Sequence, residues 1–90
     1  MIKAITCIKR KSGMSVEDFQ TYWRTDHAKV VKRLPGLRRY IQSHALLGGY
    51  RKGELIYDGI AEIWVDDVAA LRAMAGTAAY GAVQTDEENF

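Results

Sequence analysis

The chain has almost none of the residues that build covalent or metal-based frameworks. Its 90 residues include one cysteine, Cys7, and two histidines, His27 and His44. A single cysteine excludes an internal disulfide framework and is typical of a reducing compartment. The sequence also lacks a C-x-x-C pair and a helical H-x-x-x-H pair, so no recognisable ligand set is present. We therefore expect no metal site, and we expect Cys7 to be a buried, inert thiol in mid-strand.

Other absences exclude further classes of protein. No stretch approaches the ~18 apolar residues that a membrane-spanning helix needs. The first residues lack the charged and apolar regions of a secretory signal. Neither G-x-G-x-x-G nor a P-loop is present to hold a nucleotide. We expect a cytoplasmic protein that works without a cofactor.

What the chain does have is the composition of one small globular domain covering residues 1–90. Hydrophobic residues make up 48% of it and charged residues 27%, which is ordinary for a folded domain. A domain of this length buries only about 60–65% of the surface that its unfolded chain exposes. Its own core is therefore thin, and a partner subunit would add apolar burial.

Positive and negative charges are divided between the two halves of the sequence. Residues 1–52 carry twelve lysines and arginines against three acids, whereas residues 53–90 carry one, Arg72, against eight acids. Such a division can indicate an anionic ligand or nucleic acid. We favour the more ordinary interpretation, in which the charges of the two halves meet in the fold or across a dimer.

The hydrophobic pattern predicts the order strand, helix, strand, strand, helix. The strands are expected over residues 2–9, 37–46 and 55–65, and Asp66 or Asp67 should cap the helix that follows. This is the order of a ferredoxin-like β-α-β-β-α-β unit without its last strand. We expect that the final strand lies outside this chain or that a partner supplies its pairing.

The first helix has the clearest pattern. Ser15 opens a capping-box motif, and the helix should end by residue 33 because the residue before Pro35 is biased out of the helical region. Between these limits one helix face is marked by a 3-4-4-3-4 spacing. The residues on that face are Val16, Phe19, Trp23, His27, Val30 and Leu34. This face should point toward the sheet.

A second helical stripe is predicted near the C-terminal end. Gly76 should break the preceding helix, and Thr77 can cap a new helical piece. One side of that piece carries Tyr80, Val83, Glu87 and Phe90.

Several stretches of the sequence resemble the EthD family, a branch of the dimeric α/β-barrel superfamily. They are KRKSGMS (9–15), FQTYW (19–23) followed by His27, PGL (35–37) with Tyr40, and YDGIAEIW (57–64). Their order and spacing extend over essentially the whole chain. The resemblance implies an α+β, ferredoxin-like unit that closes a barrel with a second copy of itself. It also implies a pocket between each sheet and its own helices.

His27 is the main candidate for chemistry. Histidine can take or give a proton near neutral pH, and an imidazole in an aromatic pocket could enolise a small carbonyl compound without a metal. The alternative is a packed histidine that is hydrogen-bonded to a backbone carbonyl. In isomerase-type members that the chain resembles, the matching histidine and tyrosine, here His27 and Tyr40, lie in the pocket. Tyr40 could orient a carbonyl or stabilise an enolate oxygen, or it could be an ordinary cross-strand aromatic.

Four further residues are expected to line the same pocket: Phe19, Trp23, His44 and Ile63. For Phe19 and Trp23 we favour a role as wall or core over any chemical role. Asp26 lies about 100° around the helix from His27, so we do not expect the two side chains to pair.

Three functions remain open from the sequence. The first is a cofactor-independent isomerase, cyclase or lyase acting on a small carbonyl or lactone, with His27 as general acid or base. The second is a binding module that holds a small apolar or aromatic metabolite for a partner oxygenase, as the accessory role of EthD in ether degradation implies. The third, by fold analogy alone, is a cofactor-free monooxygenase. RNA binding is disfavoured, because residues 59–62 carry an acid where RNA-binding relatives of this topology carry their aromatic signature.

Overall fold

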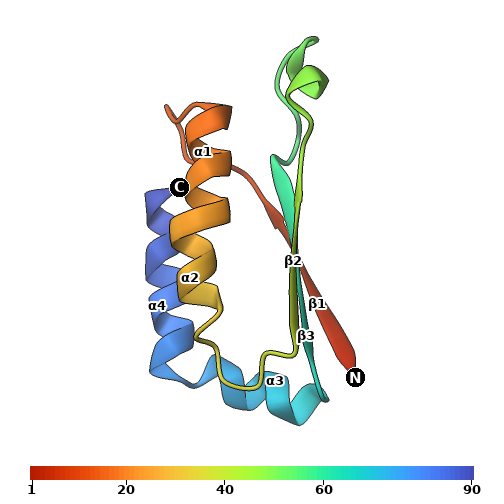
Figure 1. Cartoon of the computed structure of the whole chain (residues 1–90), viewed down its shortest axis with the longest axis vertical. Helices are drawn as coiled ribbons and strands as arrows, with labels where there is room; N and C mark the ends of the chain where they lie inside the picture. Colours follow the sequence, from red (N-terminus) through yellow and green to blue (C-terminus); the bar gives the residue numbers. More distant parts are fainter.

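Three antiparallel strands form one sheet, and helices cover only one of its faces (Figure 1). The computed structural model describes residues 1–90. The strands are β1 (Ile2–Ile8), β2 (Arg39–His44) and β3 (Gly59–Val65), in the spatial order β1-β3-β2. β3 is central and pairs with both neighbours, which leaves the outer edge of β1 unpaired within the chain. The predicted α+β class with a ferredoxin-like strand order is confirmed.

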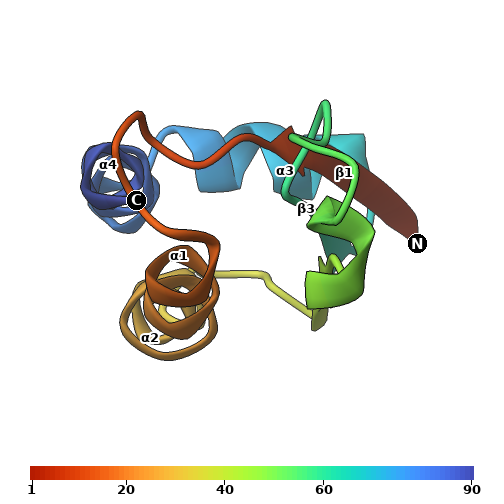
Figure 2. The ribbon, with the colours of Figure 1, turned by 90° about the horizontal axis from the view of Figure 1, so that it is seen from above.

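The helices form a layer that stands apart from the sheet. When the molecule is viewed from above, α1, α2 and α4 lie on one side and the strands on the other (Figure 2). α3 connects β3 to this layer and lies across one end of the molecule (Figure 1). None of the helices has the length and apolar character needed to span a bilayer. The helical segments are α1 (Val16–Tyr22), a π-helical turn (Trp23–His27), α2 (Ala28–Val31), α3 (Val68–Ala75), α4 (Ala78–Asp86) and short 3₁₀ turns at Leu47–Tyr50 and Glu87–Asn89.

Side-chain caps fix the starts of the helices as the sequence predicts. The side-chain oxygens of Ser15, Asp67 and Thr77 each accept a hydrogen bond from the backbone amide three residues later, at 3.1, 2.8 and 3.2 Å. Each such bond satisfies one of the free N–H groups of a first helical turn and is typically worth about 1 kcal/mol.

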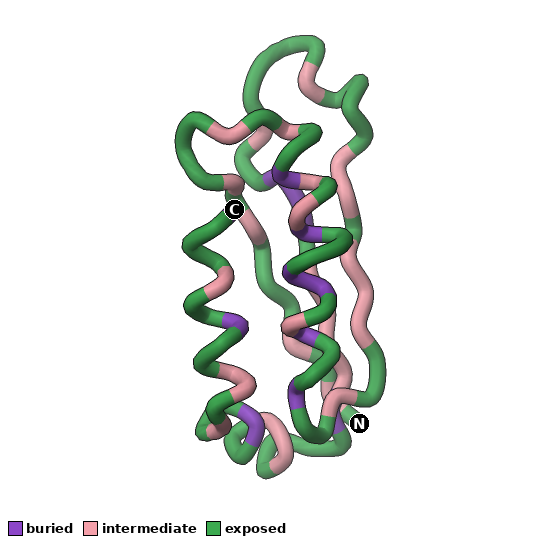
Figure 3. The backbone as a smooth tube through the Cα atoms, turned by 60° about the vertical axis from the view of Figure 1, so that its left-hand side comes forward, coloured by how far each residue is buried: buried purple, intermediate pink, exposed green.

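The first helix departs from the prediction in its middle. Over Trp23–His27 it widens into a π-helical turn, which takes more residues per turn than an α-helix. As a result, the buried face continues from His27 to Val31, which is 4% exposed, whereas Val30 is only half-buried. Val31 is thus buried more deeply than the expected Val30, although Val30 still packs against the buried core. In Figure 3 the buried positions recur along one side of α1 and α2.

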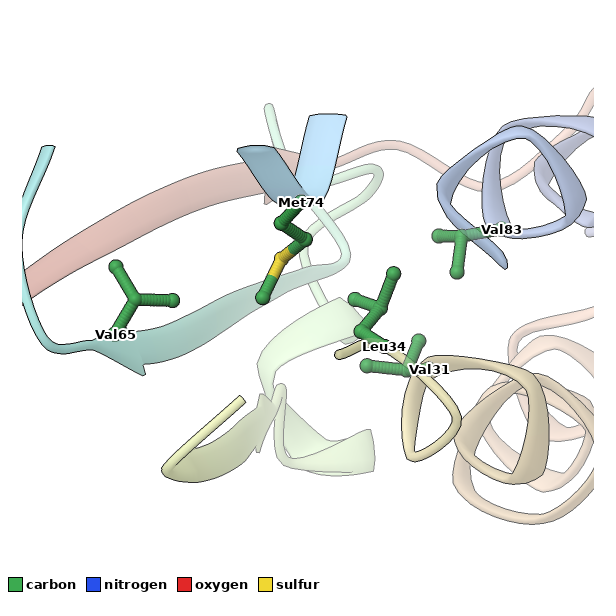
Figure 4. Packing of buried hydrophobic residues seen from close by; sticks show 5 residues of the cluster. All are labelled: Val31, Leu34, Val65, Met74 and Val83. Atoms are coloured by element: carbon green, nitrogen blue, oxygen red, sulfur yellow. The ribbon is translucent and has the colours of Figure 1, made fainter. Parts of the chain in front are cut away.

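The buried apolar side chains form two separate clusters. The first lies where α3 closes the space between the helices and the sheet, and there Met74 points into the gap between Val65 and the helix layer (Figure 4). The second is aromatic. The members of the first cluster are Val31, Leu34, Val65, Met74 and Val83, and those of the second are Phe19, Trp23 and Phe90.

Trp23 sets the spacing between helix and sheet at the aromatic end. Its ring lies on Gly59 so closely that an added Cβ on Gly59 would be 2.3 Å from Trp23 Cζ3 and 3.1 Å from the Ser43 carbonyl oxygen. Trp23 is completely buried. Only glycine leaves room for the indole at this point of β3.

Ion pairs join the two oppositely charged halves of the chain. Lys3 contacts Glu62 at 3.2 Å on the face of the sheet without helices. The other pairs between basic and acidic side chains link Lys9 and Arg10 to Glu54 and Asp58, and Arg38 to Asp66. In every pair the base comes from the first half and the acid from the second. The interpretation that the charges of the two halves meet within the fold is confirmed for four of the twelve basic residues of the first half.

A buried carboxylate explains why the third strand begins later than predicted. Asp58 is fully buried and accepts hydrogen bonds from the backbone N–H and guanidinium of Arg10, at 2.8 and 2.7 Å, and from the Tyr50 hydroxyl, at 2.7 Å. Burial opposes ionisation of Asp58, but these hydrogen bonds outweigh it and hold its pKa below the usual value. The Leu55 carbonyl accepts from Lys9 instead of from a strand. The Leu55 carbonyl and the Asp58 carboxylate are thus bound to side chains, only the Asp58 N–H reaches β1, where it bonds to the Ile8 carbonyl at 2.8 Å, and β3 starts at Gly59.

The second face of the sheet carries exposed apolar side chains. Ile5 and Ile60 are 58% and 40% exposed on it. Cys7, the cross-strand neighbour of Ile60, is also exposed. The prediction of a buried Cys7 is wrong, because β1 lies at the sheet edge and no helix covers this face.

We predict that Gly59→Ala destabilises the protein by about 1–3 kcal/mol, the usual cost of inserting a methyl group into a packed site. The added carbon must displace the Trp23 indole or the β2 backbone. Chemical denaturation measures the change. Gly81→Ala is the control, because an added Cβ there meets nothing within 4 Å and helix propensity favours alanine. Equal stability of the Gly59→Ala variant and the unmodified protein would contradict the packing described.

Candidate functional site

A cavity of about 620 Å³ lies between the helix layer and the sheet. This volume is within the range of about 300–1,000 Å³ that is typical of small-molecule sites. The aromatic cluster contributes Trp23 and Phe90 to its wall, and the aliphatic cluster contributes Val31, Leu34 and Val83. The cavity therefore occupies the space that separates the two clusters. Fourteen of its 19 lining residues are hydrophobic, with Tyr40 and Tyr80 among them, and the polar or charged ones are Thr6, Lys9, His27, Arg72 and Glu87.

The cavity brings together four of the six residues that the sequence singled out. His27 and Trp23 reach it from the helix layer, and Tyr40 and Ile63 reach it from the sheet. The predicted stripe on the last helix, from Tyr80 through Val83 and Glu87 to Phe90, also lines it.

The other two residues do not line this cavity. Phe19 packs against Trp23, with ring centroids 5.4 Å apart, and is completely buried. His44 packs on another side of Trp23, at 4.5 Å between ring centroids, and lines a smaller hollow beside Asp58 and Gly59.

His27 is paired with a carboxylate that the sequence analysis did not identify. Its Nδ1 lies 2.7 Å from Asp86 Oδ2, and the residue is 4% exposed. Asp26, its neighbour in sequence, is exposed and makes no side-chain hydrogen bond, in line with the expectation that these two do not pair. The sequence contains one indication of Asp86, because this residue lies three positions after Val83 and borders the stripe predicted on the last helix. The packing of α4 against α2 was not predictable from that stripe.

Two further side chains hold Asp86 in place. The Tyr22 hydroxyl donates to Asp86 Oδ1 at 2.6 Å, and the Asn89 amide donates to the same oxygen at 3.1 Å. Burial opposes ionisation of Asp86, but the hydrogen bonds from Tyr22, His27 and Asn89 outweigh it, so the pKa of Asp86 lies below its usual value. An ionised carboxylate only accepts hydrogen bonds. His27 must therefore carry a proton on Nδ1.

This pairing leaves the second nitrogen of His27 free. Nε2 makes no hydrogen bond within the chain, and the residue lines the cavity. A carboxylate on Nδ1–H fixes the tautomer in which Nε2 is the basic nitrogen, and it stabilises the imidazolium that forms when Nε2 takes a proton. The arrangement suits a general acid or base.

Tyr40 offers a hydrogen-bond donor from the sheet side of the cavity. Its oxygen accepts from the Gln42 amide at 2.6 Å, and the same amide donates to the Trp23 carbonyl at 2.7 Å. The hydroxyl hydrogen of Tyr40 has no acceptor within the chain. Burial raises the pKa of Tyr40, so the group stays a neutral O–H. A base on the helix side and a donor on the sheet side thus border one apolar space.

Two charged residues complete the lining. Arg72 and Glu87 both border the cavity and are exposed. Burial raises the pKa of the Glu87 carboxyl, partly offset by the charge of His27. No group of three or more His, Cys, Asp or Glu side chains lies close enough together to hold a metal ion.

We predict that Asp86→Asn lowers stability at pH 7 and that its difference from the unmodified protein narrows in acid. The folded-state pKa of Asp86 is depressed, so its contribution is present above the unfolded pKa of about 3.9 and is lost as pH falls through the folded value. Unfolding free energies measured from pH 7 down to about pH 2 test this. For Asp26→Asn, the difference in unfolding free energy from the unmodified protein should not change with pH in this way. A difference for Asp86→Asn that stays constant from pH 7 to about pH 2 would contradict the pairing of Asp86 with His27.

Comparisons with known proteins bear on the whole chain. An EthD family protein from Bacillus halodurans has a similar structure, with a TM-score of 0.78, 23% sequence identity, and coverage of 98% of this chain and 84% of that one. HapK from Hahella chejuensis matches with a TM-score of 0.70, 21% identity, and coverage of 96% and 79%. At these identities the likeness shows the fold alone. The search of curated proteins found no match. The model of the EthD domain matches residues 11–90, and the chain therefore belongs to the EthD domain family.

Proposed function

We propose that the protein is a cofactor-free isomerase, cyclase or lyase acting on a small carbonyl or lactone compound. The observation that carries the proposal is the His27–Asp86 pair, which presents a free Nε2 at the wall of an apolar cavity that also holds the Tyr40 hydroxyl. A packed structural histidine would need neither a buried carboxylate on one nitrogen nor a cavity at the other. The wall around the pair favours an apolar or aromatic ligand.

The proposed reaction begins with proton transfer to His27. Nε2 takes a proton from the carbon next to the carbonyl group, and the electron pair of that C–H bond moves to the carbonyl oxygen to give an enolate. The Tyr40 hydroxyl donates a hydrogen bond to this oxygen as its charge develops. Asp86 stabilises the imidazolium. The imidazolium then returns the proton to a second position of the substrate or to a leaving group, which restores neutral His27.

The same cavity would also serve a carrier that holds a metabolite for a partner oxygenase. Carriage requires the apolar wall but no base. The surroundings of Asp86 favour catalysis over carriage. Its second oxygen accepts hydrogen bonds from Tyr22 and Asn89, and these bonds keep the carboxylate ionised beside His27.

We predict that His27→Gln lowers the rate of proton exchange at the α-carbon of a small ketone by about 100-fold, the usual size of a general acid–base contribution. Acetophenone in D₂O is the probe, and NMR follows deuterium uptake by its methyl group. Glutamine keeps a polar group of similar reach, so affinity measured by titration calorimetry should barely change.

Asp26→Asn is the matched control for this measurement, since Asp26 adjoins His27 in sequence but is exposed. It should exchange the probe at the unmodified rate. Binding without any exchange above the buffer rate would instead support a carrier.

We further propose that the protein is a homodimer joined through the sheet face that lacks helices. Ile5 and Ile60 are exposed there, and Lys3 and Arg39 lie 5.2 and 4.9 Å from the Trp64 ring centroid. Exposed apolar side chains that are rimmed by charged ones often mark an interface between proteins. Two copies packed through it would cover these side chains and leave both cavities on the outside.

We predict that Ile5→Lys together with Ile60→Lys converts the dimer into a monomer, because four lysines would then meet at the interface. Light scattering coupled to size exclusion should change from twice the 10.1 kDa of one chain to that value. Val68→Lys is the control, since Val68 is an equally exposed apolar residue that lies on α3. A monomer of about 10 kDa for the unmodified protein at micromolar concentration would contradict this proposal.

A further inference from the structure

The side chain of Gln42 connects the Tyr40 hydroxyl to two groups outside the proposed chemistry. Gln42 lies on β2, is half-buried and does not itself line the large cavity. Its amide nitrogen donates to the Tyr40 oxygen at 2.6 Å and to the Trp23 carbonyl oxygen at 2.7 Å. Its Oε1 lies 2.8 Å from His44 Nε2. Both ends of the amide are therefore bound within the chain.

The Trp23 carbonyl determines which end of the Gln42 amide faces it. A carbonyl oxygen only accepts hydrogen bonds, so the atom 2.7 Å away must be the NH₂ nitrogen. The same nitrogen has a second hydrogen, which it donates to the Tyr40 oxygen. The contact with the backbone of the first helix thus fixes the amide as a donor toward Tyr40.

This orientation decides what the Tyr40 hydroxyl can do. A hydroxyl has one hydrogen to donate and lone pairs that accept. Because the Tyr40 oxygen accepts from Gln42, its own hydrogen is not used there and is left for the cavity that Tyr40 lines. If the amide were reversed, Oε1 would face Tyr40 and take that hydrogen. Accepting a hydrogen bond also polarises the O–H group, which strengthens it as a donor.

His44 binds the other end of the amide and must do so in one tautomer. An amide oxygen only accepts, so His44 Nε2 carries the hydrogen of the 2.8 Å bond. Nδ1 is buried and has no partner, and a proton there would be a buried donor without an acceptor. Burial, together with the nearby charge of Arg24, holds the pKa of His44 below its usual value. His44 is therefore neutral, with its hydrogen on Nε2.

We propose that Gln42 and His44 are positioning residues that keep the Tyr40 hydroxyl hydrogen available to a carbonyl oxygen of the ligand. They touch neither ligand nor reacting atoms and act through Tyr40. The site consequently selects ligands that accept a hydrogen bond at this wall. The inference rests on the proposed function only for its catalytic meaning, because the direction of the hydrogen bonds is a property of the chain itself.

The tautomers of the two histidines test the direction of these bonds without any ligand. Long-range ¹H–¹⁵N NMR spectra distinguish a protonated ring nitrogen from a bare one, and His27→Gln assigns the signals. At about pH 8, where an unperturbed imidazole is neutral, we expect His44 to carry its hydrogen on Nε2 and His27 to carry its own on Nδ1. A proton on Nδ1 of His44 at this pH would overturn the inference.

Gln42→Glu tests the effect on the ligand with almost no change of shape. An ionised carboxylate only accepts hydrogen bonds, and a protonated one has a single hydrogen, which the Trp23 carbonyl takes. In both states residue 42 has no hydrogen for Tyr40, and its oxygen draws the Tyr40 hydrogen away from the cavity. Acetophenone and ethylbenzene serve as probes, since they have similar shapes and only acetophenone carries an oxygen.

Titration calorimetry should show that the unmodified protein binds acetophenone about fivefold more tightly than ethylbenzene, the size of one net hydrogen bond. Gln42→Glu should abolish this preference, and so should Tyr40→Phe. Combining the two changes should cause no further loss, because Gln42 acts through Tyr40. Gln84→Glu is the matched control: it makes the same substitution at an exposed position of α4 and should keep the preference.

Two binding results would overturn the inference. They are a Gln42→Glu variant that keeps the full preference for acetophenone and an unmodified protein that has none. The proposed reaction is judged separately, by deuterium uptake at the acetophenone methyl group. A preference that depends on Gln42 without any exchange defeats the reaction and leaves the positioning role standing. Exchange that continues at the unmodified rate in Gln42→Glu, with the preference intact, does the reverse.

Discussion

The contact between the Trp23 indole and Gly59 determines the distance at which helix and sheet are held. A rigid aromatic ring occupies the space that a Cβ would fill, and the helix cannot move closer at that end. At the other end Met74 and its aliphatic neighbours fill the gap below α3. Interiors normally pack without voids, so a space between two such supports is a specific feature of this arrangement. The side chains at these two ends keep the helix layer and the sheet apart, and the cavity lies between them.

Successive side chains of a strand point to opposite faces of the sheet. One face of this sheet lines the cavity, and the other carries no helices. On β2 and β3, Tyr40 and Ile63 face the cavity, while Arg39 and Trp64, their neighbours in sequence, belong to the open face. A shift of one residue in register would exchange the two sets. The register in which Tyr40 pairs with Ile63 therefore keeps the cavity-lining side chains on one face and those of the proposed subunit contact on the other.

Local signals in the sequence were sufficient for the helix starts, the strand faces and the inward position of His27. Each depends on residues within a few positions of one another. The features that the sequence did not reveal depend on distant partners. Asp86 reaches His27 only because α4 packs on α2, and the late start of β3 depends on Arg10 meeting Asp58. The exposure of Cys7 depends on a sheet face that no helix covers.

The pairing of His27 with Asp86 spans 59 residues of sequence, and the backbone N–H of Lys11 is likewise bonded to the carbonyl of Phe90 at 2.7 Å. Contacts of such long separation form late, because a large loop must close before they contribute. During synthesis the imidazole is made long before the carboxylate that orients it. A nascent chain that has formed β1, α1 and β2 still has an unoriented histidine and an open-sided cavity. The proposed site is therefore complete only after α4 has docked on α2 and brought Asp86 to His27.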